Sequence, residues 1–197
     1  AGLPWELGIA ETHQTLILNG LRTRVRIESD SKLLSGRDVA ISCMLGAEEF
    51  GFGTSLLMTM GCVMMRVCNL DTCPMGICTQ NPELRKHFHG KPEYIINYLT
   101  FVAQELREYM AKLGIRTIDE LVGRTDLLHV KSAPADSRMS KMDLDCILHN
   151  PAIVNSNVHF QKEDTYDFHL EDTLDMKVLM KKFKLSSKTP QSVKLDV

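Results

Sequence analysis

The chain has 197 residues, of which 44% are hydrophobic and 24% charged, so it can bury a core and is not a disordered, collagen-like or low-complexity protein. Its net charge of −2 excludes the overall basic field that would favour nucleic acid or a membrane surface as a partner. The longest uncharged stretch, residues 50–65, is shorter than the roughly 20 residues of a membrane-spanning helix. The chain starts without Met or a secretion signal, and we expect it to be part of a longer cytoplasmic protein.

The first third of the chain predicts helices that alternate with short strands. Apolar spacing, Gly stops and a Ser35 cap indicate, in order, a helix at 6–19, a strand at 25–29, a helix from Ser35 to a stop at Gly46, a strand at 49–53 and a buried helix at 56–60. This alternation is typical of βα units around a parallel sheet, so the predicted fold class is α/β.

The middle of the chain predicts one long amphipathic helix at 91–113. Its apolar stripe consists of Ile95, Leu99, Val102, Leu106, Met110 and Leu113. Thr117 and Glu120 form a capping box for a short helix that follows. After Arg124 the periodicity is lost and proline recurs, which indicates an irregular connector or the start of another domain.

The cysteines carry the strongest chemical signal. Cys62, Cys68 and Cys73 are separated by five and four residues, and Pro74 follows the last of them. Soft thiolates in one loop suit an iron–sulfur cluster, while structural zinc loops favour two to four intervening residues. Three thiols would suit a three-iron cluster, and Cys78 is a possible fourth. The alternative is that these cysteines are small apolar side chains of a methionine-rich core.

Two turns form a second candidate site. Residues 29–33 follow the first predicted strand, and residues 50–54 follow the second and lead into a helix. Backbone N–H groups at such strand ends bind anions, including a flavin phosphate, although most turns of this kind bind nothing. His13 is expected to make a structural hydrogen bond, and His87 and His89 to lie in a solvated turn rather than to bind metal.

The motifs, taken together and in order, resemble the synthase domain of the large subunit of the glutamate synthase family. The resemblance covers residues 1–126, and its motifs are GLPWELG at 2–8, GRDV at 36–39, LGAEEFGFGT at 45–54, GCVMMRVC at 61–68, CPMG at 73–76, PELRK at 82–86, GKPE at 90–93, LGIRT at 113–117 and VGR at 122–124.

The resemblance implies that residues 1–126 are the C-terminal part of an FMN-binding (β/α)8 barrel, with strands seven and eight, and that residues 127–197 lead towards a C-terminal β-helix domain. Carried over by position, the ligands of a 3Fe–4S cluster are Cys62, Cys68 and Cys73. The turns that hold the FMN phosphate are Asp30-Ser31 and Gly53-Thr54. Ser31 stands where the family usually has Gly, and Cys78 where it more often has a small residue, so Cys78 is not counted as a ligand.

The family's reaction is the reductive amination of 2-oxoglutarate to glutamate by reduced FMN, with ammonia derived from glutamine. A reductase subunit or ferredoxin would supply the electrons, in the cytoplasm or in a plastid. The sequence assigns no acid–base catalyst in this segment. Two alternatives stay open: an FMN-dependent barrel similar to 2-hydroxy-acid oxidases, and a non-catalytic assembly module that binds a metal or a cluster.

Overall fold

The structure, a computed structural model, describes residues 2–30, 32–132, 134–135, 137–151, 167–183, 189 and 192. The chain divides into two compact units, residues 1–162 and 163–197. The first unit contains α1 (Trp5–Leu18), η1 (Arg22–Arg24), β1 (Glu28–Ser29), α2 (Gly36–Met44), β2 (Glu49–Phe50), α3 (Thr54–Thr59), η2 (Cys68–Leu70), α4 (Pro82–Arg85), α5 (Pro92–Leu113), α6 (Ile118–Leu121), η3 (Thr125–Leu127), η4 (Arg138–Lys141) and α7 (Asp145–Leu148). In the second unit the described elements are η6 (Leu170–Asp172), η7 (Asp175–Leu179) and α8 (Met180–Lys182).

The first five predicted elements are present in the predicted order, as α1, β1, α2, β2 and α3. The strands are parallel, with Glu28 opposite Glu49 and Ser29 opposite Phe50. They are shorter than predicted, because regular pairing extends over only two residues of each strand. The described part of the chain is therefore mostly helical with one short parallel pair, which is consistent with part of an α/β domain.

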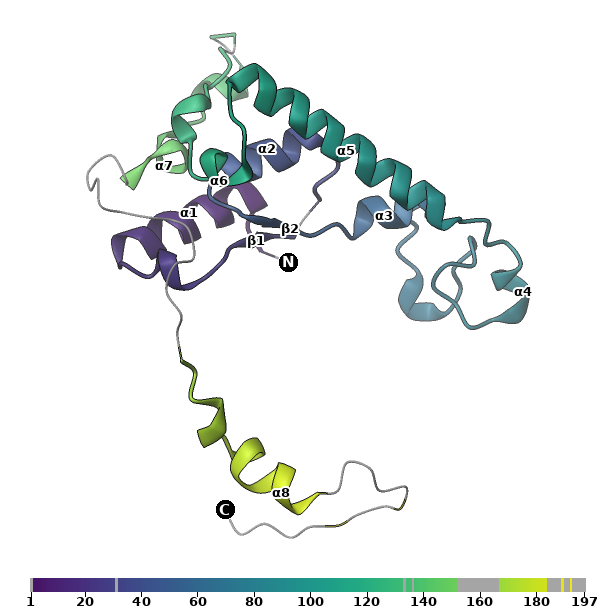
Figure 1. The fold of residues 1–197 in the computed structure, drawn as a ribbon. Helices are drawn as coiled ribbons and strands as arrows, with labels where there is room; N and C mark the ends of the chain where they lie inside the picture. Colours follow the sequence, from purple (N-terminus) through teal and green to yellow (C-terminus); the bar gives the residue numbers. More distant parts are fainter. Residues whose placement is uncertain are drawn as a thin grey trace. The chain divides into compact units, whose positions relative to one another are not determined.

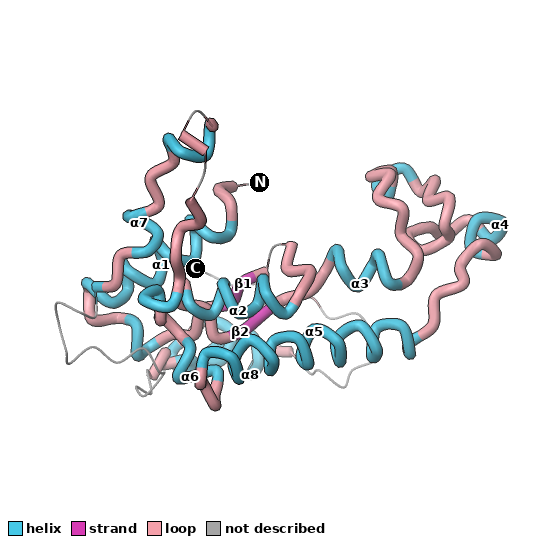
Figure 2. The backbone as a smooth tube through the Cα atoms, turned by 90° about the horizontal axis from the view of Figure 1, so that it is seen from above, coloured by secondary structure: helices cyan, strands magenta, loops and turns pink. Residues whose placement is uncertain are grey.

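The long helix α5 packs along α2 (Figures 1 and 2). At their closest approach a side chain on Gly36 would lie 2.5 Å from the Leu106 backbone nitrogen, so glycine permits this contact. The Gly36 N–H also donates to Glu105 Oε2 at 2.7 Å. Val102 and Met110 are buried, which confirms the apolar stripe at these two positions, while Leu99, three residues before Val102, is exposed.

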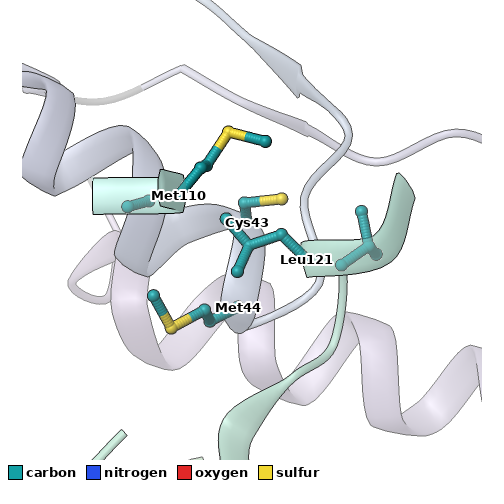
Figure 3. Packing of buried hydrophobic residues seen from close by; sticks show 6 residues of the cluster. Cys43, Met44, Met110 and Leu121 are labelled. Atoms are coloured by element: carbon teal, nitrogen blue, oxygen red, sulfur yellow. The ribbon is translucent and has the colours of Figure 1, made fainter. Parts of the chain in front are cut away.

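A sulfur-rich core joins α2, α5 and α6 (Figure 3). Cys43, Met44, Met110 and Leu121 are all buried there. Burial, with a smaller contribution from nearby carboxylates, raises the pKa of the Cys43 thiol to about 12. This cysteine is therefore a neutral, inert core residue at physiological pH. Phe50 at the end of β2 packs against this cluster and against the two other apolar clusters of the unit.

The short helix α3 differs from the prediction, which gave it a buried position. Leu57 is 39% exposed and Met58 is 49% exposed, and Ser55 is the buried residue of the helix. Among the described residues, α3 lies beside the N-terminal half of α5 and has no second layer over its outer face (Figure 1). Apolar composition predicted burial here, but burial depends on a covering element.

A buried polar network connects α1 with the loops before and after α2. Arg22 is 1% exposed, and its guanidinium donates to His13 Nδ1 at 3.1 Å, to the Val25 carbonyl at 2.8 Å and to the Gly46 carbonyl at 3.1 Å. It also forms an ion pair with Glu48. His13 thus has the structural hydrogen bond that the sequence predicted.

Stability should fall at acidic pH because of His13. Burial, and secondly the charge of Arg22, lowers the pKa of His13 from 6.5 to about 4. The unfolded chain therefore binds this proton more tightly than the folded chain. The stability contributed by the neutral ring is complete above pH 6.5 and is lost as the pH falls through 4, a difference of about 3 kcal/mol.

Urea unfolding followed by circular dichroism at pH 7 and pH 4 measures this loss. The control is His13→Asn, whose side-chain oxygen can still accept from Arg22 but does not titrate. We expect the wild-type chain to lose about 3 kcal/mol more than the variant between these pH values. Parallel pH profiles for the two proteins would contradict the role of His13.

Candidate functional site

The cysteine loop, residues 60–81, lies between α3 and α4 beyond the N-terminal end of α5 (Figures 1 and 2). Its backbone is unusual, because Met64, Arg66 and Asp71 have φ angles of 59°, 61° and 57°. Each such conformation costs about 1 kcal/mol or more for a residue with a side chain, so surrounding contacts must hold it. Backbone strain of this kind concentrates at functional sites.

Asp71 ties the two halves of the cysteine loop together. Its Oδ1 accepts from the Thr79 hydroxyl at 2.9 Å and from the Gln80 N–H at 2.7 Å, and its carbonyl accepts a second contact from the same hydroxyl at 3.0 Å. The hydrogen bond from Gln80, followed by that from Thr79, lowers the pKa of the Asp71 carboxyl. These hydrogen bonds therefore hold the segment around Asp71 against residues 79–80.

Backbone donors surround two of the predicted ligand sulfurs. The pKa of the Cys73 thiol is lowered, chiefly by the backbone N–H of Cys78 and with further contributions from residues 75–77. The sulfur of Cys62 accepts from the Met64 N–H at 3.4 Å. The arrangement at Cys73 favours negative charge on sulfur, as thiolate ligands require.

Cys78 lies in the same loop as the three predicted ligands. Its pKa is raised, first by partial desolvation and then by its interactions with Cys68, Cys73 and Cys62. Its side chain is exposed.

The loop closes on a turn that requires glycine at position 76. Gly76 has a φ of 69°, and a side chain there would lie 2.4 Å from the Leu84 carbonyl oxygen. His87 reaches back from the end of α4, with its Nδ1 3.1 Å from the Pro74 carbonyl. An open cavity of about 210 Å³ adjoins the loop, and its lining consists of Thr59, Met60, Gly61, Met75, His87, His89, Gly90 and Tyr94.

The cysteine side chains of the loop are not a hydrophobic core. Cys68 and Cys78 are exposed and Cys62 is half-buried. Cys73 is buried, but it is absent from the apolar clusters that the described residues form. The core thiol of this chain is Cys43, and burial raises its pKa, whereas backbone donors lower that of Cys73.

The second candidate site lies where the two parallel strands end. The Gly51 N–H donates to the Ser29 carbonyl at 2.9 Å, and a side chain on Gly51 would lie 2.7 Å from Asp30 Cβ. Asp30 is therefore packed beside the turn that leads to Gly53 and Thr54, where α3 begins. Ser31 lies outside the described residues.

Two buried hydroxyl groups lie near these strand ends, one in the predicted turn at 29–33 and one just after the predicted turn at 50–54. The side-chain oxygens of Ser29 and Ser55 are buried and have no hydrogen-bond partner within the described part of the chain. Ser29 is the last residue of β1, and Ser55 follows Thr54 in α3. Buried polar atoms are normally satisfied, so this edge has unused hydrogen-bonding capacity.

The second unit contains a separate group of potential ligands. Asp167, His169 and Glu171 have ligand atoms within 4.8 Å of one another, but all three side chains are exposed, and such groups are common without a metal. Among the described residues, no helix is both long and apolar enough to cross a membrane.

The described residues between 2 and 151 thus form a mostly helical segment with one short parallel strand pair and a loop of constrained backbone that contains four cysteines. The chain belongs to the glutamate synthase family, because residues 1–116 match the conserved region in glutamate synthase. This finding confirms the resemblance that the motifs indicated.

Curated relatives support the same assignment. The glutamate synthase (NADPH) large chain of Bacillus subtilis is 52% identical over 180 residues, which cover 91% of this chain and 12% of the relative. The glutamate synthase (NADH) of Schizosaccharomyces pombe is 52% identical over 184 residues, or 91% of this chain and 8% of the relative. Ferredoxin-dependent glutamate synthase 2 of Synechocystis is 44% identical over 151 residues, which cover 77% of this chain and 10% of the relative. The chain spans about a tenth of the length of these relatives.

Proposed function

We propose that this chain forms part of a glutamate synthase and contributes the ligands of a 3Fe–4S cluster together with part of the FMN site. The observation that carries the proposal is that Cys62, Cys68 and Cys73 lie, at this spacing, in one loop of constrained backbone. Membership of the glutamate synthase family supports the same proposal.

The donor set fits an iron–sulfur cluster. Thiolates are the usual ligands of such clusters, and N–H donors to their sulfurs tune the reduction potential. The backbone groups of residues 75–78 and of Met64 would serve this purpose at Cys73 and Cys62. A bound cluster would supply single-electron transfer, while the protein sets its environment.

The strand ends fit the phosphate of FMN through their backbone. The Asp30 carboxylate would repel a phosphate, so the N–H groups of the Asp30-Ser31 turn and of Gly53-Thr54 are the donors that we assign. The unpartnered Ser55 hydroxyl lies beside the second turn and adds a donor. In this proposal residues 1–126 complete a (β/α)8 barrel and residues 127–197 lead towards a β-helix domain. Bound FMN would supply the hydride chemistry.

The reaction proposed for the whole enzyme is the reductive amination of 2-oxoglutarate with ammonia derived from glutamine. The electron donor is a reductase subunit or ferredoxin, since the relatives include enzymes named for NADPH, for NADH and for ferredoxin. Relatives from plants carry the word chloroplastic in their names, and others are bacterial or fungal. We therefore keep the cytoplasm and the plastid as the two proposed locations.

Iron and acid-labile sulfide in protein purified without oxygen test the cluster assignment. We expect about three irons and four sulfides per chain, and loss of both in Cys68→Ser. The matched control is Cys146→Ser, because Cys146 is also exposed but lies in α7, outside the loop. Wild-type iron content in Cys68→Ser would contradict the assignment.

The same measurement separates the two alternatives. A 2-hydroxy-acid oxidase-like barrel would share the FMN turns but would leave Cys62, Cys68 and Cys73 without a role, so bound iron and sulfide count against it. An assembly module would be indicated by bound zinc without sulfide.

A further inference from the structure

We propose that Asp71 is a positioning residue for the iron–sulfur cluster: it holds the segment that carries Cys68 and Cys73 in one conformation and thereby keeps the cluster bound. This inference rests on the proposed function, in which Cys62, Cys68 and Cys73 are the ligands. Asp71 acts through the backbone that carries two of these ligands, and its own carboxylate binds no iron.

Asp71 lies between two of the proposed ligands, at a point where the backbone is left-handed. It directly follows η2, which begins at Cys68, and it precedes Cys73 by two positions. Its φ is 57° and its ψ is 24°, a conformation that aspartate and asparagine tolerate better than other residues with a side chain. Such a conformation persists only where contacts hold it, and it sets the direction in which the chain runs from Cys68 to Cys73.

Two hydrogen bonds from the far side of the loop, which we call the Asp71 clasp, hold this conformation. The Asp71 Oδ1 accepts from the Thr79 hydroxyl at 2.9 Å and from the Gln80 N–H at 2.7 Å. Thr79 is buried, so water competes little for its hydroxyl. The same hydroxyl accepts from the Asn81 N–H at 3.1 Å, and the Asn81 side chain caps α4 by accepting from the Glu83 N–H at 2.9 Å. The clasp is thus anchored on a helix.

The helix α4 is also connected to the loop on the other side of Cys73. His87, just beyond the end of α4, has its Nδ1 3.1 Å from the Pro74 carbonyl oxygen. Pro74 directly follows Cys73, whose side chain is buried. The segment that carries the Cys73 thiol is therefore fixed at both ends, and Asp71 provides the end nearer to Cys68.

A clasp of this kind should slow the release of iron. It limits the conformations that the loop can adopt, so thiols that dissociate from the cluster stay close enough to bind again. Hydrogen-bond partners that orient metal ligands typically change metal affinity by about 10–100-fold. We expect an effect of this size when the clasp is removed.

Variants at both ends of the clasp separate its effect from those of backbone conformation and charge. Asp71→Asn keeps an oxygen acceptor and tolerates the left-handed conformation, but it has no charge. Asp71→Gly adopts the left-handed conformation without strain, but it has no acceptor. Thr79→Val removes the hydroxyl donor and leaves Asp71 unchanged. Asp143→Gly is the matched control, because the exposed Asp143 also accepts a backbone N–H, from Asp145 at 2.9 Å, but lies outside the loop.

The experiment follows iron release from the cluster-loaded chain, kept free of oxygen. Electron paramagnetic resonance first records the signal of the oxidised three-iron cluster in each protein. Dithionite and the ferrous chelator bathophenanthroline disulfonate are then added, and the rate at which the coloured iron complex forms is measured. The resonance signal reports the geometry of the ligands before any iron has left.

We expect iron to leave Asp71→Gly and Thr79→Val about 10–100 times faster than the wild type, with an altered resonance signal. Asp71→Asn and Asp143→Gly should match the wild type in both measurements. Failure of Asp71→Gly to take up a cluster that Asp71→Asn does take up would also support the clasp.

The inference would be overturned, and the proposed function left intact, if Asp71→Gly released iron at the wild-type rate. Release from Asp71→Asn as fast as from Asp71→Gly would overturn it as well, because the clasp would then not be the cause. A wild-type chain without iron and sulfide would overturn the proposed function, and this inference with it.

Discussion

Replacing Arg22 with methionine is expected to lower the free energy of unfolding by about 3–5 kcal/mol, because removing one partner of a buried ion pair leaves the other uncompensated. Methionine fills a similar length but donates no hydrogen bond. The variant would leave Glu48, His13 Nδ1 and the carbonyls of Val25 and Gly46 without their shared donor. Urea unfolding at pH 7, followed by circular dichroism, measures the loss.

Arg26→Met is the matched control. Arg26 lies four residues further along and forms an ion pair with Glu49 at 2.9 Å, but the two side chains are 61% and 47% exposed. Solvent screens such a pair, so we expect little change in the unfolding midpoint. If the two variants were equally stable, the buried network around Arg22 would not contribute to the fold as described.

Replacing Gly46 with alanine should cost about 4 kcal/mol, for two independent reasons. Its φ of 124° lies in a region that residues with a side chain rarely adopt. The added methyl group would also lie 2.3 Å from Cγ of His13, and the ring is held by its hydrogen bond from Arg22. Thermal unfolding of the variant beside the wild type measures the effect.

Gly20→Ala separates the two causes. Gly20 also has a positive φ, 64°, but no atom lies within 4 Å of the position where its side chain would be. We therefore expect a loss of about 1–2 kcal/mol from backbone conformation alone. A loss in Gly46→Ala no larger than this would show that the His13 ring moves aside at little cost.

Local signals account for the elements that the sequence predicted well. The Ser35 hydroxyl accepts from the Asp38 N–H at 3.2 Å, and the Thr117 hydroxyl accepts from the Glu120 N–H at 3.3 Å, so both predicted caps are confirmed. The long helix ends at Gly114, which has a φ of 74°. These features depend on residues within four positions of one another, and a single sequence displays them directly.

Features that depend on distant partners were not predictable in the same way. The burial of Arg22 requires His13, Gly46 and Glu48, which lie 9 to 26 positions away in the sequence. The exposure of α3 and the shortness of the strands depend on which elements cover them and pair with them. A single sequence does not display such partners.

The same distinction applies to the cysteine loop. The spacing of Cys62, Cys68 and Cys73 indicated a cluster loop. However, no glycine marks the left-handed backbone at Met64 and Arg66. The connection between the two halves of the loop depends on the contact of Asp71 with Thr79, eight positions along the chain. The sequence therefore predicted the loop but not its internal arrangement.

The ring of His13 constrains how this region can change during evolution. It occupies the space in which a side chain at Gly46 or at Gly123 would lie, since an added methyl group at Gly123 would be 2.8 Å from His13 Nε2. While the histidine remains, neither glycine can be replaced without a clash. Once a smaller residue stands at position 13, position 123, with its φ of 73°, could accept asparagine or aspartate. Position 46 would still require glycine, so a substitution at position 123 can only follow one at position 13.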